Sequence, residues 1–585
     1  MKCKFIFFCF SIIIINISCT PSGSKPRQDQ NLLFDAFTER FMDAFMKQHP
    51  GYAIFEAYPL YNDTLIIPTE KSFNSEIIWL NNYLDSLDTY SFDQLNMQNK
   101  ISYRVLENEL KKQKWQIETF KDYEWDPSQY NIGWDVYDLL TRTSLTLDAR
   151  LKILSKYLVN APAFYDATIN ILHNPVKEHT LIGLQQNEGS IEIFEFMLND
   201  SIQKSTLPSA EKEVLLKRSG ESVAAIKKYI SYLHSTLDDS SFVFRSYRIG
   251  EELFDQKFAF EIVSDFSAQE IYNRADLARK SYYVNMYAIT KNLWPKYFKN
   301  NALPADTLLA IQQMIDVVSL QHTKPEDLTD TLHQHIKNLK TFIVSKNLFD
   351  FDINAPVNIR EMPAFASGVT IASASFPPVY QKNGIAYYNI SDISKLPKEE
   401  TESILKEYNN YTLQFLSIHE GIPGHCLQGI YNSKHSSEKI TSVFSNGTMI
   451  EGWANYCHRM MLENGLGNNT DEMWLMFYKS ALRECCNVLI DYGIHCLDYT
   501  EEEVRDLLVK KAFQEEAQVM EKYNRAKVTQ VQLYTYFTGV TEIESLLAKY
   551  KEEQGENYQL KNFHEQFLSY GSAPIKYIRE IMLNE

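Results

Sequence analysis

Hydrophobic residues recur at steps of three and four from residue 31 to about residue 348. Near the start of this region Phe34, Phe37, Phe41 and Phe45 follow that spacing, which places them on one face of a helix. The same spacing appears in the segments 77–87, 101–110, 149–158 and 214–233. We therefore predict a helical lobe over residues 31–348, either as one wall of a substrate channel or as scaffold only.

The pattern changes between residues 349 and 392. The segments 357–359, 369–371 and 385–390 are rich in β-branched and aromatic residues and are separated by Pro and Asn-Gly breaks. This predicts a small sheet, in which an exposed edge strand could pair with an extended peptide.

Helical spacing resumes at residue 397 and continues to the end of the chain. The segments that carry it are 399–418, 451–464, 471–492, 500–523, 529–550 and 558–568. The expected fold class is mainly α with a small β-sheet. Residues 349–585 form the region expected to carry the chemistry, in one continuous domain with the helical lobe.

The first residues resemble a targeting segment rather than part of the fold. Lys2 and Lys4 precede an apolar stretch over residues 5–15 that is short for a membrane span, and Cys19 follows a small residue. We expect residues 1–18 to be a lipoprotein signal peptide, Cys19 to carry lipid, and residues 19–30 to be a polar tether. Asn16 departs from the usual Leu of a lipoprotein cleavage site, and the alternative is an ordinary signal peptide cut nearby.

Composition narrows the classes of partner. The chain of 585 residues has 75 acidic and 58 basic residues, a net charge of −17, and no long basic run. Nucleic acid is therefore not an expected partner. The expected localisation is the cell envelope, with membrane contact through the lipid on Cys19.

The stretch from His419 to His425 reads H-E-G-I-P-G-H, and Glu451 follows after 25 intervening residues. A hydrolytic zinc site needs three protein ligands and an open position for water, whose pKa the metal lowers to roughly 7. We predict that His419, His425 and Glu451 bind Zn²⁺. Glu420 would then be the general base that accepts the proton of the water and later returns it to the leaving amine.

The two histidines are six positions apart, which on a regular helix would aim them in different directions. Pro423 cannot donate to the carbonyl of His419, and Gly424 tolerates unusual backbone angles. We therefore predict a bulge or kink that returns His425 to the metal. The alternative is that His425 is only a helix-end residue and another group completes the site.

Other polar residues of the last third are candidates for supporting roles. Tyr536 could donate to the oxyanion formed from the scissile carbonyl, and His495 could do the same or bind substrate. Arg483 could hold a peptide carboxylate in a bidentate pair. For each of the three, a structural role is the alternative.

Asp491 is a candidate for orienting a metal-binding histidine, with capping or a core position as the alternative. Trp453 and Tyr456 are expected to pack the helix that carries Glu451.

Five cysteines lie in the body of the chain: Cys426, Cys457, Cys485, Cys486 and Cys496. Five is an odd number and no C-x-x-C pair occurs, so a thiolate zinc site is not supported. We expect small buried apolar residues, with Cys426 close to the site but not a ligand.

The stretch H-E-G-I-P-G-H-C-L-Q followed by E-G-W-A-N-Y resembles the bacterial family catalogued as domain of unknown function 885. The resemblance continues in 491–495, 536–539 and 563–574, and covers about residues 350–585. That family is similar to zinc peptidases of the thimet oligopeptidase and angiotensin-converting enzyme type. The resemblance implies a zincin-like fold with helical lobes around a substrate channel, Glu451 as third ligand and a substrate-binding role for His564.

Two positions depart from the family pattern. Cys426 stands where a second His is common, and Asn487 stands where Arg is frequent. Neither is an expected ligand, so the departures bear on substrate preference more than on catalysis.

The favoured function is a zinc-dependent peptidase that hydrolyses oligopeptides. One alternative is a non-catalytic surface lipoprotein that binds glycans or peptides, although such a protein has no need of a base beside a metal ligand. Another is a metal-dependent hydrolase of a non-peptide amide or ester that uses the same residues.

Overall fold

The computed structural model describes residues 29–350, 352–354, 356–362, 371–381, 386–435 and 439–583. The expected signal peptide, Cys19 and most of the expected tether lie outside the described residues, as does most of the strand expected at 369–371.

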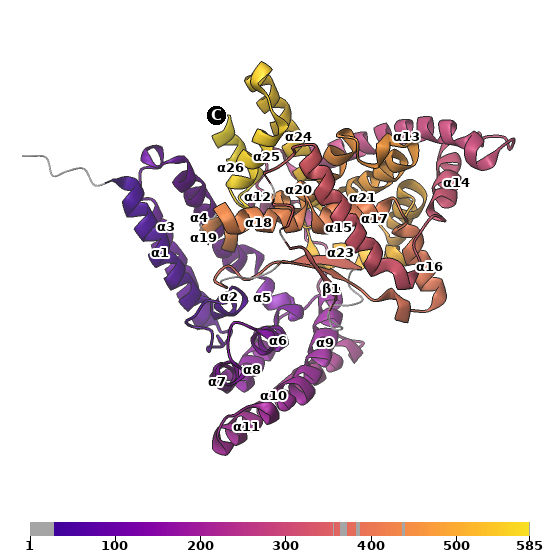
Figure 1. The fold of residues 1–585 in the computed structure, drawn as a ribbon. Coiled ribbons are helices and arrows are strands. Elements are labelled where there is room, and N and C mark those ends of the chain that lie inside the picture. Colours follow the sequence, from indigo (N-terminus) through magenta and orange to yellow (C-terminus); the bar gives the residue numbers. More distant parts are fainter. Residues whose placement is uncertain are drawn as a thin grey trace, which may run out of the picture.

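The chain is mainly helical, as expected, and its elements form four successive groups (Figure 1). The first group is α1 (Gln30–Gln48), α2 (Pro50–Phe55), α3 (Glu70–Leu87) and α4 (Met97–Trp115). The second is η2 (Gln116–Phe120), α5 (Asp122–Trp125), α6 (Gly133–Thr141), α7 (Leu147–Tyr157), α8 (Ala161–Ile171), α9 (Lys177–Glu192), η5 (Ile193–Leu198), α10 (Asn199–Lys204) and α11 (Ser209–Asp238).

The third group is α12 (Gly250–Glu261), α13 (Ala268–Phe298), α14 (Thr307–Ser319) and α15 (Leu328–Ser345). After the sheet, the fourth group begins with α16 (Lys398–Glu407), α17 (Thr412–Leu416), η8 (Ser417–Gly421), α18 (His425–His435), α19 (Lys439–Val443), α20 (Gly447–Glu463) and α21 (Asp471–Cys496). It ends with α22 (Glu501–Arg505), η10 (Asp506–Lys511), α23 (Ala517–Thr529), α24 (Tyr534–Gln554), α25 (Leu560–Ser569) and α26 (Ile575–Met582).

Short 3-10 turns connect these helices. They are η1 (Phe92–Gln94), η3 (Pro127–Gln129), η4 (Leu158–Asn160), η6 (Pro325–Asp327), η7 (Ile393–Lys395), η9 (Leu466–Asn469) and η11 (Gly555–Asn557). None of the helices in the described part of the chain combines the length and the apolar character that a membrane span needs.

Many helices form where the apolar spacing predicted them, but the single helices expected at 399–418 and 500–523 are each broken into shorter pieces, and the helix expected from residue 529 begins at Tyr534. In α1 the four phenylalanines at 34, 37, 41 and 45 are all buried, and the side chain of Asp29 caps the helix by accepting from the Asn31 amide. α13 begins with a capping box, in which Ser267 and Glu270 each accept from the other's backbone amide. Local signals therefore account for where these helices begin.

Two large hydrophobic cores divide the molecule, and a small third cluster contains Phe120, Trp125 and Val176. One core joins α1, α3 and α4 to nearly everything from α12 to α26, and we call this part the main body. The other lies mainly among residues 130–237, with Ile54 of α2 and Leu65 added from earlier in the chain. We call residues 130–237 the peripheral lobe; its helices α6 to α11 project from the main body at the bottom of Figure 1. The main-body core contains residues from both sides of residue 348. The helices before residue 348 therefore do not pack together as one separate lobe.

The predicted small sheet is present and has three strands in the order β1-β3-β2. The strands are β1 (Asn358–Glu361), β2 (Ala372–Ser375) and β3 (Tyr387–Ile390). β1 pairs with β3 in parallel and β2 pairs with β3 antiparallel, which leaves β2 as an edge strand. Tyr388 and Ile390 of β3 are buried, and β2 lies against η8.

Candidate metal centre

The predicted bend between the two histidines is present. His419 lies in a π-helical turn, η8, and His425 begins the next helix, α18, with Pro423 between them after a cis peptide bond. The Gly424 amide donates to the carbonyl of Ile418 at 2.9 Å. A Cβ on Gly424 would lie 2.1 Å from the carbonyl oxygen of His419, so the bend requires glycine at this position.

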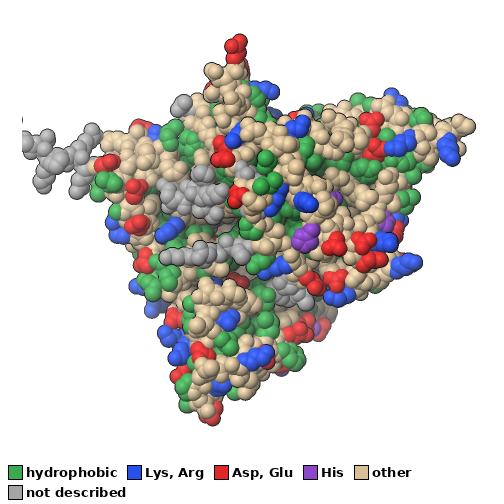
Figure 2. All heavy atoms as spheres, in the orientation of Figure 1, with side chains coloured by type: hydrophobic (Ala, Val, Ile, Leu, Met, Phe, Trp, Pro, Cys, Tyr) green, Lys and Arg blue, Asp and Glu red, His purple; other side chains and the backbone are tan. Residues whose placement is uncertain are grey.

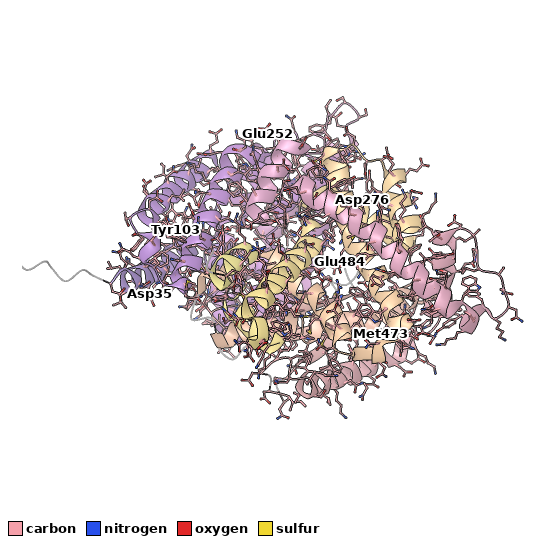
Figure 3. The ribbon with its side chains drawn as sticks, turned by 90° about the horizontal axis from the view of Figure 1, so that it is seen from above. Asp35, Tyr103, Glu252, Asp276, Met473 and Glu484 are labelled. Atoms are coloured by element: carbon pink, nitrogen blue, oxygen red, sulfur yellow. The ribbon has the colours of Figure 1, made fainter. Side chains whose placement is uncertain are left out.

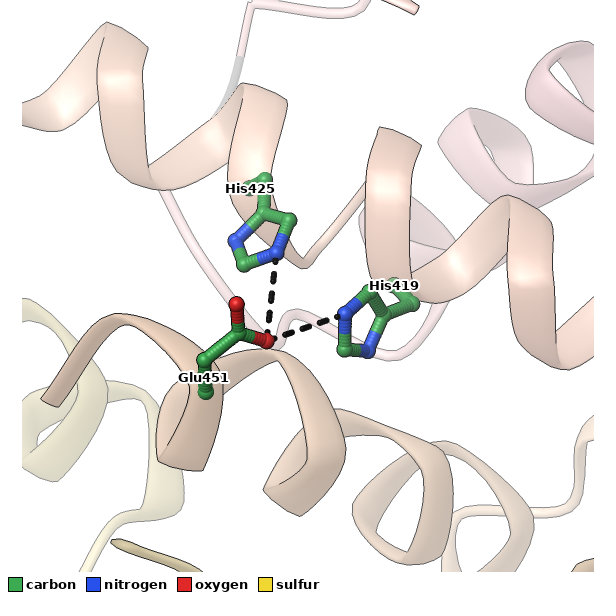
Figure 4. A group of neighbouring side chains, drawn as sticks. All are labelled: His419, His425 and Glu451. Atoms are coloured by element: carbon green, nitrogen blue, oxygen red, sulfur yellow. Dashed lines mark ion pairs between the residues drawn. The ribbon is translucent and has the colours of Figure 1, made fainter. Parts of the chain in front are cut away.

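The bend brings the two imidazoles to the same carboxylate (Figure 4). The Nε2 atom of His419 lies 3.4 Å from Oε2 of Glu451, and the Nε2 atom of His425 lies 3.7 Å from the same oxygen. One ligand atom from each of the three residues lies within 4.8 Å of the other two. Three side chains from η8, α18 and α20 therefore surround one point.

The spacing and chemistry of these atoms suit a tetrahedral divalent ion. Two ligands about 2.1 Å from a tetrahedral zinc lie about 3.4 Å apart. Oε2 of Glu451 is buried, and no donor among the described residues hydrogen-bonds it. A buried carboxylate oxygen without a donor is costly unless something else satisfies it, and two nitrogens and one oxygen are a ligand set that zinc accepts.

Protonation of His425 and Glu451 agrees with this assignment, whereas burial of His419 is outweighed by Glu451 and Glu420, which raise the pKa of that ring. Burial, with the neighbouring His419 second, lowers the pKa of His425 to about 4, so its ring is neutral at pH 7. Burial opposes ionisation of Glu451, but His419 and His425 outweigh it and lower the pKa of this carboxylate. A neutral imidazole and a charged carboxylate are the forms that bind metal.

Close packing fixes the position of Glu451. The next residue, Gly452, meets Gly539 of α24 so closely that a Cβ on Gly452 would lie 2.5 Å from the Cα of Gly539. Trp453 is fully buried, and its indole N–H donates to the carbonyl of Pro423 at 2.9 Å. α20 is therefore held to α24 on one side and to the histidine bend on the other.

Glu420 is almost fully buried beside the first histidine, with 8% of its surface exposed. Burial raises its pKa to about 7; His419 opposes this and Glu451 adds to it. The backbone amide of Ala374 in the edge strand β2 hydrogen-bonds the carboxylate. A carboxyl group with a pKa close to neutral can both accept and return a proton.

Tyr536 lies on the Glu451 side of the site. Burial and then the charge of Glu451 raise the pKa of Tyr536, so its phenol keeps its proton. Nη2 of Arg525 donates to the Tyr536 hydroxyl oxygen at 3.0 Å, which leaves the phenol proton free to be donated.

Arg483 is on α21, with one third of its side chain exposed. Its guanidinium lies 3.7 Å from Glu407, and that carboxylate is bonded more closely by Lys479, at 2.5 Å. Arg483 thus makes a loose ion pair with Glu407 and a side-chain hydrogen bond with Tyr408, and its role in holding a substrate carboxylate stays a prediction.

The structure does not bring Asp491 and His495 to the triad. The two carboxylate oxygens of Asp491 accept from the amides of Val531 and Leu533, both at 3.1 Å, so Asp491 caps the turn before α24 instead of orienting a ligand histidine. The Nε2 atom of His495 hydrogen-bonds the Ala526 carbonyl at 2.8 Å, and its ring is buried.

His564 is also used within the fold rather than presented to a substrate. Its Nε2 atom lies 2.9 Å from the Tyr456 hydroxyl and its Nδ1 atom 3.1 Å from the Leu348 carbonyl, and the residue is fully buried. Both ring nitrogens have partners, which corrects the expectation of substrate binding. Tyr456 packs the helix of Glu451, as predicted.

Sequence reasoning missed three groups near the site. His458, two turns after Glu451 on α20, places its ring 5.5 Å from that of His419. Glu484 of α21 is close enough for His419 and Glu451 to affect its pKa, which burial raises to about 8; seen from above it lies near the middle of the molecule (Figure 3). The third group is Arg525 of α23. Only the seven-residue step from Glu451 to His458 was a readable signal, because the other two come from distant helices.

The cysteines of the body are small buried residues, as expected. Cys426, Cys457, Cys485 and Cys486 are buried and Cys496 is partly buried, and all five have free thiols. Burial, with Glu420 second, raises the pKa of Cys426 to about 12, so this thiol beside the site is protonated.

Comparison with known proteins connects this geometry to a family. The family model described as "Bacterial protein of unknown function (DUF885)" matches residues 50–582. The chain belongs to the DUF885 family. The match includes the peripheral lobe and nearly all of the main body, and so extends well before the segment in which the sequence motifs were recognised.

Two solved structures are similar to this DUF885 protein over nearly their whole lengths. One is described as "a putative lipoprotein of unknown function from Shewanella oneidensis"; it is 38% identical, with a TM-score of 0.86, over 94% of this chain and 99% of that one. The other, "the putative lipoprotein from Colwellia psychrerythraea", is 15% identical, with a TM-score of 0.76, over 95% and 99%, and shows the fold alone. No curated protein matches the chain.

Proposed function

We propose that this DUF885 protein is a zinc-dependent peptidase that hydrolyses oligopeptides. The observation that carries the proposal is the convergence of His419, His425 and Glu451 within 4.8 Å, with the carboxyl group of Glu420 directly beside them. A protein that only binds ligands has no need of a near-neutral carboxyl group next to three metal-binding side chains.

In this proposal Glu420 is the general base and then the general acid. Zinc held by the three ligands supplies a Lewis acid and a water molecule of lowered pKa. The Glu420 carboxylate accepts the proton of the water as the oxygen attacks the scissile carbonyl carbon, and later gives it to the leaving amine. A pKa of about 7 allows both transfers near neutral pH.

Tyr536 supplies the donor for the oxyanion. Its hydroxyl accepts from Arg525 at 3.0 Å, which orients the phenol and increases its acidity as negative charge develops. Because only hydrogen bonds that strengthen in the transition state raise the rate, Tyr536 is expected to act on kcat more than on KM.

The edge strand β2 gives an extended substrate a place to pair. Ala374 of β2 hydrogen-bonds Glu420, so a peptide added beside this strand would lie next to the base. Main-chain pairing of this kind holds a peptide without reading its side chains, which suits hydrolysis of varied oligopeptides.

The proposal also includes export to the cell envelope and a lipid anchor on Cys19. Its support is the charged and apolar pattern of the first residues together with the lipoprotein descriptions of both similar structures. Mass spectrometry of the protein from membranes would detect a diacylglyceryl group on Cys19, and its absence would contradict the anchor.

A digest of a synthetic peptide library by the zinc-loaded protein tests the function, with Glu420→Gln as the matched control. Removing a positioned general base costs about 10²- to 10⁴-fold in kcat. Since Gln keeps the volume of the side chain, metal analysis should give the same zinc content for both proteins.

The result has three clear outcomes. Cleavage by the wild type that Glu420→Gln lacks supports the peptidase. Bound zinc with cleavage of non-peptide esters or amides alone would favour the other hydrolase, and absence of stoichiometric metal would favour a binding lipoprotein.

A further inference from the structure

Four cationic side chains lie on the two helices beside the metal triad and have few carboxylate partners. They are Lys479 and Arg483 on α21 and Lys522 and Arg525 on α23. Glu407 bonds Lys479 at 2.5 Å and lies 3.7 Å from Arg483, so one carboxylate serves both. Lys522 and Arg525 on α23 have no carboxylate within 4 Å among the described residues. Glu484 of α21 also affects the pKa of Arg483, but burial raises the pKa of Glu484 to about 8, so this group is mostly neutral at pH 7 and positive charge exceeds negative charge on this side of the site.

Lys522 is the least satisfied of these cations. It is only 9% exposed, and its Nζ atom donates to the neutral amide oxygen of Asn487 at 2.9 Å. Burial, followed by the charges of Arg483 and Arg525, lowers its pKa to about 7. A buried ammonium group is costly without an opposite charge, and an anion placed here would relieve that cost.

Arg525 connects this charge to the metal side. One of its nitrogens, Nη2, donates to Gln532 at 2.9 Å and to the Tyr536 hydroxyl at 3.0 Å. The guanidinium group has five N–H donors in all, so others remain for a ligand. The charges of Arg525 and Glu451 also affect each other's pKa, which places the cluster on the Glu451 side of the triad.

Arg483 supplies the accessible edge of the cluster, because one third of its side chain is exposed while Lys522 lies behind. The planar guanidinium matches a carboxylate, which it can bind through two parallel N–H···O bonds. The acid on α23, Glu521, is exposed; its charge acts to raise the pKa of Lys522 and Arg525, but it makes no ion pair within 4 Å of either among the described residues.

We propose that Arg483, Lys522 and Arg525 form a subsite that binds a carboxylate group of the substrate beside the metal. This inference rests on the proposed peptidase function and specifies its substrate class. The carboxylate is either the C-terminal group of a short peptide, in which case the enzyme cuts near C-termini, or the side chain of an acidic residue.

Paired substrates test the subsite and separate the two sources. The first pair is an acetylated pentapeptide with a free C-terminus and the same peptide as its C-terminal amide. The second pair is two amidated peptides that end in Asp or Asn. Hydrogen bonds to a charged group are worth about 10- to 100-fold, so kcat/KM should be higher by that factor for the free acid, or for the Asp peptide.

Variants show whether these residues cause the preference. Lys522→Met and Arg483→Gln should each reduce the ratio of kcat/KM between charged and neutral substrate to about threefold or less. Lys527→Met is the matched control, because Lys527 is the other cation of α23 and has its own partner, Glu178, at 3.6 Å. It should keep the full preference. Melting curves check that each variant is folded.

A binding measurement keeps the inference separate from the catalytic proposal. Zinc-loaded Glu420→Gln is titrated with each peptide pair by calorimetry. Tighter binding of the charged peptide supports the subsite if that difference is lost in the double variant Glu420→Gln with Lys522→Met. This holds even if the wild type cleaves neither peptide, because absence of cleavage would overturn only the peptidase. Equal binding of charged and neutral peptides, no binding of either, or equal cleavage of both overturns the subsite.

Discussion

The peripheral lobe and the main body satisfy their polar groups in different ways. In the lobe the ion pairs made by lysines lie on the surface, as in Lys204 with Asp200, while the buried His179 pairs with Asp126. The buried Asn187 bonds the Tyr165 hydroxyl and the carbonyls of Tyr130 and Gly183. In the main body an ion pair, Lys479 with Glu407, is itself buried. Over the face shown in Figure 2, acidic and basic side chains are interspersed.

Buried polar atoms without a hydrogen-bond partner show the contrast most clearly. Around the metal triad they include Nδ1 of His425, Oε2 of Glu451 and Nε2 of His458, whereas residues 130–237 have only Nε of Arg150 and Nδ1 of His179 among the described atoms. Of these two atoms, Nδ1 of His179 is not isolated, because it lies 2.9 Å from Oδ1 of Asp126. Unpartnered buried atoms also occur elsewhere in the main body, for example Nε2 of His49 and Oγ1 of Thr290; of those near the triad, Oε2 of Glu451 is the one that the proposed zinc would satisfy.

The largest expected effect concerns the two kinds of ion pair. Lys479→Met leaves the buried Glu407 with only the distant Arg483 and should lower the free energy of unfolding by about 3 kcal/mol or more. Lys204→Met removes an exposed pair in the lobe and should change it by less than about 0.5 kcal/mol. Urea unfolding of both variants measures this, and equal losses would remove the distinction between the two regions.

A pair of glycines gives the next contrast. Gly539→Ala would place a Cβ 2.2 Å from the carbonyl oxygen of Thr448, which the backbone cannot relieve without separating α20 from α24, so we expect a loss of about 3 kcal/mol. At Gly220 in α11 nothing lies within 4 Å, and Gly220→Ala should stabilise by about 0.5–1 kcal/mol. Thermal unfolding compares them; a tolerated Gly539→Ala would contradict the described contact.

Zinc should act on one region only. At a free concentration 100-fold above its dissociation constant it should add about 2.7 kcal/mol to the stability of the main body. Hydrogen exchange should then slow in η8 and α20 and stay unchanged in α8 and α11. His419→Ala is the control and should abolish the response, while slower exchange in both regions would show that metal binding is not local.

A pH titration gives the smallest effect. Burial raises the pKa of Glu542 on α24 to about 7, so the folded state holds this proton more tightly than the unfolded state. The contribution of Glu542 to the free energy of unfolding is full below pH 4.5 and declines as pH rises through 7. The decline between pH 5 and pH 7 is about 2 kcal/mol. Glu542→Gln should flatten that part of the stability profile, and an unchanged slope would assign it to another group.

The sequence predicted the parts of the site that lie close together along the chain. The Pro423-Gly424 bend could be inferred because proline and glycine have specific backbone effects, and the phenylalanine spacing of α1 revealed its buried face. Partners from distant helices could not be inferred. Asp491 and His564 are polar residues near the motifs in sequence, but tertiary packing commits them to backbone and hydroxyl partners elsewhere.

The division into two cores was equally invisible in the sequence. Helical periodicity tells which face is buried but not against which element, so residues 31–348 resembled a single lobe. In the structure α1, α3 and α4 pack with the C-terminal helices, whereas α6 to α11, joined by Ile54 of α2 and by Leu65, form a second core.

The backbone contact between Gly452 and Gly539 limits how the site can move. No side chain lies between α20 and α24 at that point to slide or change rotamer, so the Glu451 carboxylate and the Tyr536 phenol travel as one rigid unit. Because the Trp453 indole also bonds the Pro423 carbonyl, the histidine turn is tied to the same pair of helices.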